Sequence, residues 1–417
     1  MLTTPIPGKI PKNRRVECER WIEEHIQDEG LRALASEYWQ TPIALYTGSG
    51  VSTCSPVPGV AQRYGLPTWF PMLGQVSGEP DSTVWPENPW EAAQKAVELC
   101  GGRDEFKRRL RQLIQSAQNY RGKGQLKGTF VTHADTLRAV AAFCGQLSGR
   151  IINPEQKEPR IAHFRTSANP RVRAVLTSNY DCFLEAAGSN LYRNSPLKPV
   201  TALGSRAGSM SRIPVFHIHG YVPHPLHQSE EREQTVDELV ITKEDYQKYW
   251  KPEDVFGTTM GPQIHYLRYF TILFVGFSFV DEYVCKLLRQ VYADYLSSAG
   301  RTHFALLEER LVRERGRAFF QEMGITPIEY QHHDEIPDKL GQVYRAGLAA
   351  DRIVAGEKPV TQIPLPEMLV KKHTLTNRTY QYPLEGIWEI MLACRNESVN
   401  ASLLRRIETF ENGPQEE

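Results

Sequence analysis

Short apolar runs alternate with longer segments of helical spacing along most of the chain, and this alternation constrains the fold more than any other feature. The apolar runs are the one that begins at Ile43 and residues 174–178, 214–219, 239–242, 270–275, 303–307 and 326–330. Repeated alternation of strand and helix predicts an α/β fold with a mostly parallel sheet and helices on both faces. In such sheets, ligands bind at the carboxyl ends of the strands.

Polar or glycine-rich clusters follow four of these predicted strands. They are Gly48-Ser49-Gly50, Thr177-Ser178-Asn179-Tyr180-Asp181, His219-Gly220 and Gly276-Phe277-Ser278. Because the carboxyl ends of parallel strands share one edge of the sheet, we expect these clusters to converge on one cleft.

The first of these clusters favours a phosphate-bearing ligand. Gly48 and Gly50 allow the backbone to turn sharply and to approach an anion, and Ser52 adds a hydroxyl group. A helix that begins after the turn would contribute its positive end. The third glycine of the usual dinucleotide-binding motif is missing, so a plain turn is the alternative interpretation.

The composition excludes several classes of protein. The 417 residues include 49 Lys and Arg and 49 Asp and Glu, so the formal net charge is +0 and no global field attracts nucleic acid or an anionic membrane. The seven cysteines are scattered and form no Cys-x-x-Cys pair, which is typical of reduced thiols in a cytosol. The sequence shows no membrane span and no signal peptide, so we expect a cytoplasmic protein.

The chain divides into three predicted parts. Residues 1–40 form an N-terminal helical segment, residues 41–350 form the main domain, and residues 351–417 form a C-terminal extension. Residues 79–147 have helical spacing and are predicted to be an insertion in the main domain. The polar, proline-containing residues 149–171 are predicted to be a surface connection.

Five ordered motifs resemble the ligand-site motifs of the sirtuin family. They are Gly48-Ser49-Gly50-Val51-Ser52, Gly65-Leu66-Pro67-Thr68-Trp69, Thr177-Ser178-Asn179-Tyr180-Asp181, His219-Gly220 and Gly276-Phe277-Ser278. The set looks most like the bacterial sirtuin-like branch found in antiphage defence, and it spans roughly residues 43–348. The resemblance implies a Rossmann-like domain that binds NAD, with Asn179 and His219 at the positions of the family's asparagine and catalytic histidine.

The chain also departs from the deacylating sirtuins. Those proteins carry two Cys-x-x-Cys pairs for structural zinc after the histidine, whereas no cysteine lies between Cys182 and Cys285 here. His224 and His227 lack a carboxylate or cysteine at ligand spacing, so we expect no metal site. The defence branch hydrolyses NAD, so the resemblance implies an NAD+ glycohydrolase. The alternatives are an NAD-dependent protein-lysine deacylase and a non-catalytic module that senses NAD or another nucleotide.

Hydrolysis of the bond between nicotinamide and ribose defines the expected roles. The sugar becomes oxocarbenium-like, so the site must hold the pyrophosphate, orient the ribose and activate a water or a hydroxyl group. His219 is expected to take the proton, because imidazole titrates near neutral pH, and Asn179 is expected to orient the ribose or the water. The residues expected to bind the cofactor are Gly48, Ser49, Gly50 and Ser52 at the phosphates, Gly276 and Ser278 at the adenosine half, and Asp181 as a brace for the Asn179 loop.

Each of these residues also has a structural interpretation. A histidine at the end of a strand is often structural, and His217 is expected to share the face of His219. Asn179 and Asp181 suit turn and N-cap positions. Asp281 is predicted to be a helix cap rather than a ligand contact.

The implied activity requires control, because constitutive destruction of NAD would kill the cell that makes the enzyme. We therefore expect gating by a partner or ligand, through the insertion, residues 53–70 or the apolar tail around Trp388. The resemblance to this branch implies a homo-oligomer. Some members of the branch act with a DNA-translocating ATPase of the HerA type, so the resemblance also suggests such a partner. This chain has no Gly-x-x-x-x-Gly-Lys loop, so such an ATPase would be a separate protein. A monomer whose tail packs on its own core is the alternative.

Overall fold

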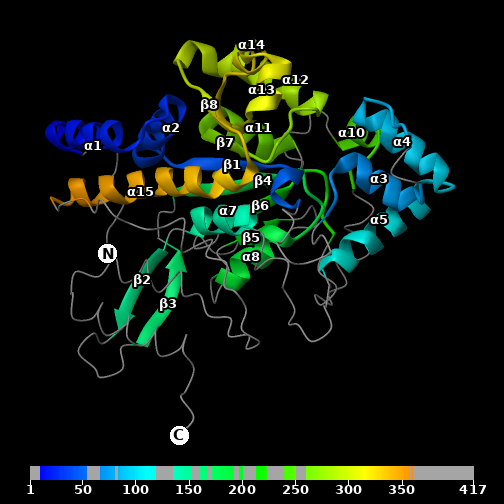
Figure 1. The fold of residues 1–417 in the computed structure, drawn as a ribbon, viewed down its shortest axis with the longest axis horizontal. Coiled ribbons are helices and arrows are strands. Elements are labelled where there is room, and N and C mark those ends of the chain that lie inside the picture. Colours follow the sequence, from blue (N-terminus) through cyan, green and yellow to red (C-terminus); the bar gives the residue numbers. More distant parts are fainter. Residues whose placement is uncertain are drawn as a thin grey trace, which may run out of the picture.

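A computed structural model of the chain contains a seven-stranded, wholly parallel sheet (Figure 1). In spatial order, the strands are β5 Leu197–Val200, β6 Ile213–His217, β4 Val172–Thr177, β1 Ile43–Thr47, β7 Thr271–Val275, β8 His303–Glu308 and β9 Ile325–Tyr330. The structure describes residues 10–53, 66–79, 83–118, 135–145, 147–152, 160–166, 171–191, 197–200, 213–222, 239–249, 260–356 and 359. The sheet confirms the predicted α/β, Rossmann-like fold.

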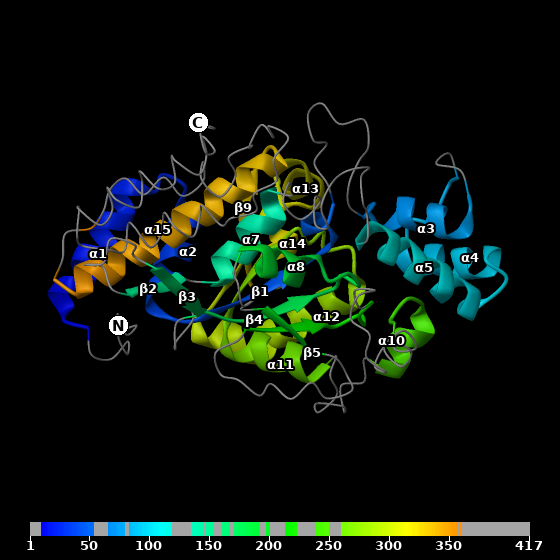
Figure 2. The ribbon, with the colours of Figure 1, turned by 90° about the horizontal axis from the view of Figure 1, so that it is seen from below.

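Helices cover both faces of the sheet, as predicted. One face carries α7 Asp135–Gly145, α8 Phe183–Leu191 and α15 Ile336–Val354, and α15 packs against α1 Lys12–His25 and α2 Glu29–Gln40. The other face carries α11 Met260–Tyr269, α12 Glu282–Val291, α13 Glu309–Arg315 and α14 Arg317–Gln321. In Figure 2, α15 and α7 lie on one side of β1 and β4, and α11 lies on the other side. Short segments of other helix types are η3 Tyr292–Leu296, η4 Ser297–Ala299 and η5 His333–Glu335.

Strand β1 lies in the middle of the sheet because all five of its residues can be buried. Ile43 and Leu45 belong to the core that contains α1, α2, α7 and α15, whereas Ala44 and Tyr46 belong to the core that contains α11 and α12. A strand buried on both faces has a continuous apolar sequence, which is the pattern from which β1 was predicted.

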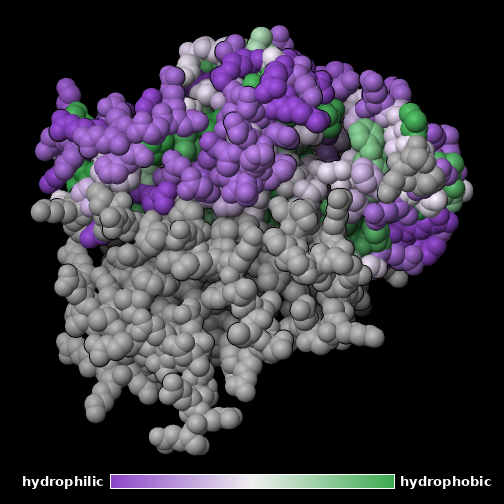
Figure 3. Space-filling view, viewed as in Figure 1, coloured by the Kyte–Doolittle hydropathy of each residue, from purple (hydrophilic) through white to green (hydrophobic). Residues whose placement is uncertain are grey.

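Helices α3 Trp69–Ser77, α4 Pro89–Leu99 and α5 Arg103–Gln118 pack on one another and lie beside α10 Lys243–Tyr249, at one end of the molecule (Figure 2). Helix α4 begins where the sequence dictates, since Asn88 Oδ1 accepts a hydrogen bond from Trp90 N at 2.9 Å. Figure 3 shows hydrophobic surface at this end of the molecule, where Val84 and Leu99 are exposed. Helix α7, although it falls within the predicted insertion, packs against α8 and α15.

Three local expectations were wrong. Residues 239–242 form no strand, because the Ile241 and Thr242 amides donate to the Asp245 carboxylate instead of to a neighbouring strand. Strand β6 ends at His217 rather than at residue 219. Two antiparallel strands, β2 Leu147–Ile152 and β3 Arg160–Thr166, lie partly within residues 149–171, which were predicted to be a surface connection without strands. The apolar tail around Trp388 lies outside the described residues.

Candidate active site

Four neighbouring strands end at the same level of the sheet. Thr47 at the end of β1 pairs with Thr177 in β4 and with Val275 in β7, and Thr177 pairs with His217 in β6. Each of the four polar clusters therefore starts at one edge of the sheet. From β1 the chain continues to β4 on one side, and it returns to β7 on the other side, so β1 and β7 flank the point where the strand order reverses. Ligands bind outside that point in open parallel sheets.

The turns after β1 and β7 touch through their glycines. A Cβ atom on Gly48 would lie 2.5 Å from Gly276 O, and one on Gly50 would lie 2.7 Å from Gly276 Cα. The Gly48 amide donates to Val275 O at 3.1 Å, and the Gly50 amide donates to Gly276 O at 2.9 Å. The two glycines thus allow close approach of two backbones, and their amides are used within the protein.

The turn after β1 continues as a short 3₁₀ segment, η2 Ser49–Val51, and no α-helix follows it in the described residues up to Thr53. A helix that begins after Thr53 would lie outside the described residues. The Ser49 side chain is exposed and that of Ser52 is buried. Ser278, after β7, is also exposed.

Asn179 links the β4 and β1 turns. Its side-chain Nδ2 donates to Gly48 O at 3.1 Å and to Ser52 Oγ at 2.9 Å. The backbone amide of Asn179 donates to Thr177 Oγ1 at 3.1 Å. The buried amide group is thereby fixed in orientation, and its other polar end, Oδ1, is an acceptor that carries no charge.

Asp181 supports the same loop through contacts with Phe183 and Ser52. Its Oδ1 accepts a hydrogen bond at 2.9 Å from the amide of Phe183, the first residue of α8. Burial raises the pKa of Asp181 to about 6, although hydrogen bonds from Phe183 and Ser52 oppose the rise. The carboxylate therefore connects the start of α8 to the β1 turn.

His217 points to the other side of the loop from His219. Its Nε2 lies 2.7 Å from Glu185 Oε1, and its Nδ1 lies 2.9 Å from Asn179 O. Burial lowers the pKa of His217, but Glu185 outweighs that effect and the net shift is upward. The expectation that the two histidines share a face was wrong, because the strand ends at His217 and the chain then turns. His217 instead holds the Asn179 backbone.

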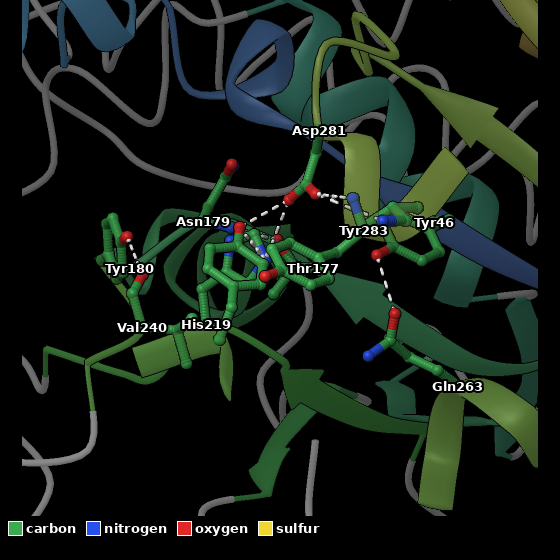
Figure 4. Close-up of polar contacts among 11 residues, drawn as sticks. Tyr46, Thr177, Asn179, Tyr180, His219, Val240, Gln263, Asp281 and Tyr283 are labelled. Atoms are coloured by element: carbon green, nitrogen blue, oxygen red, sulfur yellow. Dashed lines mark hydrogen bonds and ion pairs between the residues drawn. The ribbon is translucent and has the colours of Figure 1, made fainter. Parts of the chain in front are cut away.

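His219 lies in a buried cluster with Tyr246 and Asp281, and Figure 4 shows Asp281 pointing toward it. Tyr246 Oη is 3.1 Å from His219 Nε2, and Asp281 Oδ2 is 3.4 Å from the same nitrogen. The Tyr246 hydroxyl donates to Asp281 Oδ2 at 2.6 Å. Burial lowers the pKa of His219, while Asp281 and a hydrogen bond to the Ser178 backbone oppose this shift. The ring is thus favoured in its neutral form, with an anion beside it.

Asp281 has a second role at the start of α12. Its Oδ1 accepts hydrogen bonds from Tyr283 N at 2.9 Å and from Val284 N at 3.2 Å, which confirms the predicted cap. The sequence missed that the other carboxylate oxygen reaches His219, and it missed Tyr246 altogether. One pattern could have pointed to Asp281, since it follows a predicted strand by only a few residues, as the other clusters do.

The described part of the chain contains no group of three or more His, Cys, Asp or Glu side chains that could hold a metal ion. His224 and His227 lie outside it. None of its helices has the length and apolar character that crossing a bilayer requires.

Residues 173–328 match a family model described as a SIR2-like domain. The matched region runs from β4 into β9 and includes Asn179, His219, Gly276 and Asp281. No curated protein matches the chain. SIR2-like domains typically bind NAD and use it in enzymatic reactions. The match supports a relationship between this chain and the sirtuin-like superfamily.

Proposed function

We propose that the protein is an NAD+ glycohydrolase, which hydrolyses NAD+ to nicotinamide and ADP-ribose. One observation carries the proposal. The region similar to SIR2-like domains contains a buried histidine with a lowered pKa and an asparagine whose side chain is fixed by hydrogen bonds, and both follow strands at the carboxyl edge of a parallel sheet. A general base must be neutral before it accepts a proton, and burial favours that form of His219.

The reaction breaks the bond between C1′ of the ribose and the nicotinamide nitrogen, whose positive charge is neutralised by the bonding electron pair. Water bonds to C1′ and loses a proton. We assign the uptake of that proton to His219, and we assign orientation of the ribose or the water to the Asn179 amide oxygen. Asn179 adds no charge beside a sugar that develops positive charge.

The glycine turns would receive the dinucleotide. Gly48, Gly50 and Gly276 allow the turns after β1 and β7 to pack directly against each other, and Ser49 and Ser278 present exposed hydroxyl groups after β1 and β7. Ser52 and Asp181 are expected to act on the ligand indirectly, since both side chains are buried and support the loop that carries Asn179. We infer that Ser49 and Ser278 contact the ligand, and that Ser52 and Asp181 shape the site.

Release of nicotinamide from NAD+ by the purified full chain tests the proposal. Release without an acylated peptide is expected, and it should be lost in His219→Ala and in Asn179→Ala. His265→Ala is the matched control, because His265 is an exposed histidine on α11. A requirement for an acylated peptide would replace the hydrolase with a deacylase, and NAD binding without turnover under any condition would identify a sensing module.

We further propose that this activity depletes NAD in the cytoplasm during antiphage defence and is held off until a partner or ligand engages the protein. The support is the resemblance to the defence branch, which also suggests a homo-oligomer and a separate HerA-type ATPase. Light scattering on the full chain and on a chain that ends near Asp351 tests assembly. If each of the two chains has the mass of its own monomer, the proposed oligomer is excluded. Full turnover by the isolated protein, unchanged by any added partner, would exclude the gate.

A further inference from the structure

Helix α10 connects the candidate base to the helices α3 to α5 through two adjacent residues. Tyr246 contacts His219 and Asp281, as described above. The preceding residue, Asp245, forms an ion pair with Arg103, the first residue of α5. The Asp245 side chain is fully buried, and its Oδ2 accepts hydrogen bonds from the amides of Ile241 and Thr242 at 3.0 and 2.8 Å. Asp245 is therefore fixed by the backbone of the residues just before α10, and its ion pair with Arg103 connects it to α5.

Aromatic rings make a second contact between the same helices. The Trp90 ring of α4 lies 5.6 Å from the Tyr246 ring and 4.7 Å from the Tyr283 ring, measured between centroids. Tyr246 and Tyr283 stack with their centroids 4.6 Å apart. Tyr283 belongs to the first turn of α12, which Asp281 caps. Trp90 thus packs against both elements that supply partners to His219, and aromatic pairs of this kind favour defined geometries.

Counting protons shows what Tyr246 does to His219. The hydroxyl group has one proton and donates it to Asp281 Oδ2 at 2.6 Å. Toward His219 Nε2, 3.1 Å away, the Tyr246 oxygen can then act only as an acceptor, so it favours a protonated Nε2. The other groups that face the ring are the Asp281 carboxylate, the Ser178 backbone and the Tyr180 ring, whose centroid is 6.4 Å away. The first two also favour the protonated ring, against burial.

We propose that Tyr246 is a positioning residue for His219, and that α3 to α5 control the proton affinity of His219 by holding α10 through Arg103 and Trp90. The consequence for activity rests on the proposed NAD+ hydrolysis, but the link between the helices and His219 does not. Displacement of α10 would remove the acceptor at Nε2 and leave Asp281 without its hydroxyl donor. The helical segment beside the site would then regulate the base without contacting it.

Titration of His219 in the full chain, followed by NMR on isotope-labelled histidine and assigned with His219→Gln, tests the link. Tyr246→Phe keeps the ring and removes the hydroxyl group, so the pKa of His219 should fall by about one unit. Arg103→Ala should lower it in the same direction, and Arg103→Lys, which keeps the charge, should restore most of the value. Trp90→Leu is a second variant that leaves the ion pair intact. Arg108→Ala is the matched control, because Arg108 pairs only with Glu105 on an exposed face of α5 among the contacts described.

The outcomes separate the parts of the proposal. An unchanged titration of His219 in Tyr246→Phe would overturn the positioning role. A shift in Tyr246→Phe without one in Arg103→Ala or Trp90→Leu would overturn control by α3 to α5. If the expected shifts occur while the wild-type chain releases no nicotinamide from NAD+ under any condition, the proposed hydrolase fails and the link stands. If the chain is active, the acid limb of its pH profile should move with the pKa of His219 in every variant.

Discussion

Replacement of Asp281 by asparagine should separate the structural role of this residue from its effect on His219. Asn keeps an oxygen that can accept hydrogen bonds from Tyr283 N and Val284 N, which now cap α12 through Asp281 Oδ1. Asn and Asp are similarly favourable at N-cap positions, so the free energy of unfolding should change by about 1 kcal/mol or less at about pH 8. The negative charge beside His219 is lost.

The expected effect on His219 follows from the distance between the two groups. Asp281 Oδ2 lies 3.4 Å from His219 Nε2 and raises the pKa of the histidine against the effect of burial. An opposite charge within about 4–6 Å changes a pKa by about 1–3 units, so Asp281→Asn should lower the pKa of His219 by about that amount. This corresponds to about 1.4–4 kcal/mol in the free energy of protonation.

NMR titration of His219 measures the shift directly, and two further measurements follow from it. The acid limb of nicotinamide release should move to lower pH, and the plateau rate should fall because the base is weaker. The folded-state pKa of His219 lies below its unfolded value of about 6.5, so stability is complete above that value and is lost as the pH falls through the folded pKa. Asp281→Asn should lose more stability than the wild type in acid only. A pKa of His219 that stays constant or rises in the variant would refute this reasoning.

Three other predictions follow. Gly276→Ala should destabilise the fold by about 2–4 kcal/mol in urea unfolding, because the φ of Gly276 is +63° and a Cβ would lie 2.6 Å from Val51 N. The control is Gly300→Ala, which should cost about 1–2 kcal/mol, because Gly300 has a similar φ of +60° and no such contact. Burial raises the pKa of Asp181 to about 6, so ionisation of Asp181 opposes folding above that pH. Asp181→Asn should therefore raise the midpoint of urea unfolding at about pH 8 and not at about pH 4. An equal rise at both pH values would show that ionisation of Asp181 is not the cause. A chelator should leave nicotinamide release unchanged, and a loss that added zinc reverses would reveal a metal site that includes residues outside the described ranges.

The central strands could be predicted because their environment leaves a strong pattern in the sequence. Strands β1 and β7 are buried along their whole length, and each is a continuous apolar run that ends in glycine. Residues 239–242 have a similar apolar pattern and form no strand, because Asp245 accepts the amides that a sheet would need. Strand β5 lies at the edge of the sheet and contains Pro199, which has no amide proton, so its sequence did not indicate a strand.

The candidate site was predictable only in part. Asn179 and His219 were identified by the resemblance of short motifs, each of which follows a strand. The partners of His219 come from segments that are distant in sequence, since Tyr246 is 27 residues and Asp281 is 62 residues further along the chain. Periodicity describes neighbours within one element, so it could not bring these three side chains together. Asp281 was correctly predicted as a cap because capping is a local property.

The loop after β7 determines the geometry of both halves of the candidate site. Gly276 packs against the turn after β1, and five residues later Asp281 reaches His219. The chain can return to the strand edge over so short a distance because Phe279 adopts a φ of 55°, which is unfavourable for a residue with a side chain. Its ring is buried and packs against the rings of Phe277 and Phe320, with centroids 4.9 and 5.5 Å away, so the hydrophobic core holds this conformation in place. Packing beneath the loop therefore fixes the distance between the glycine turns and the charge beside His219.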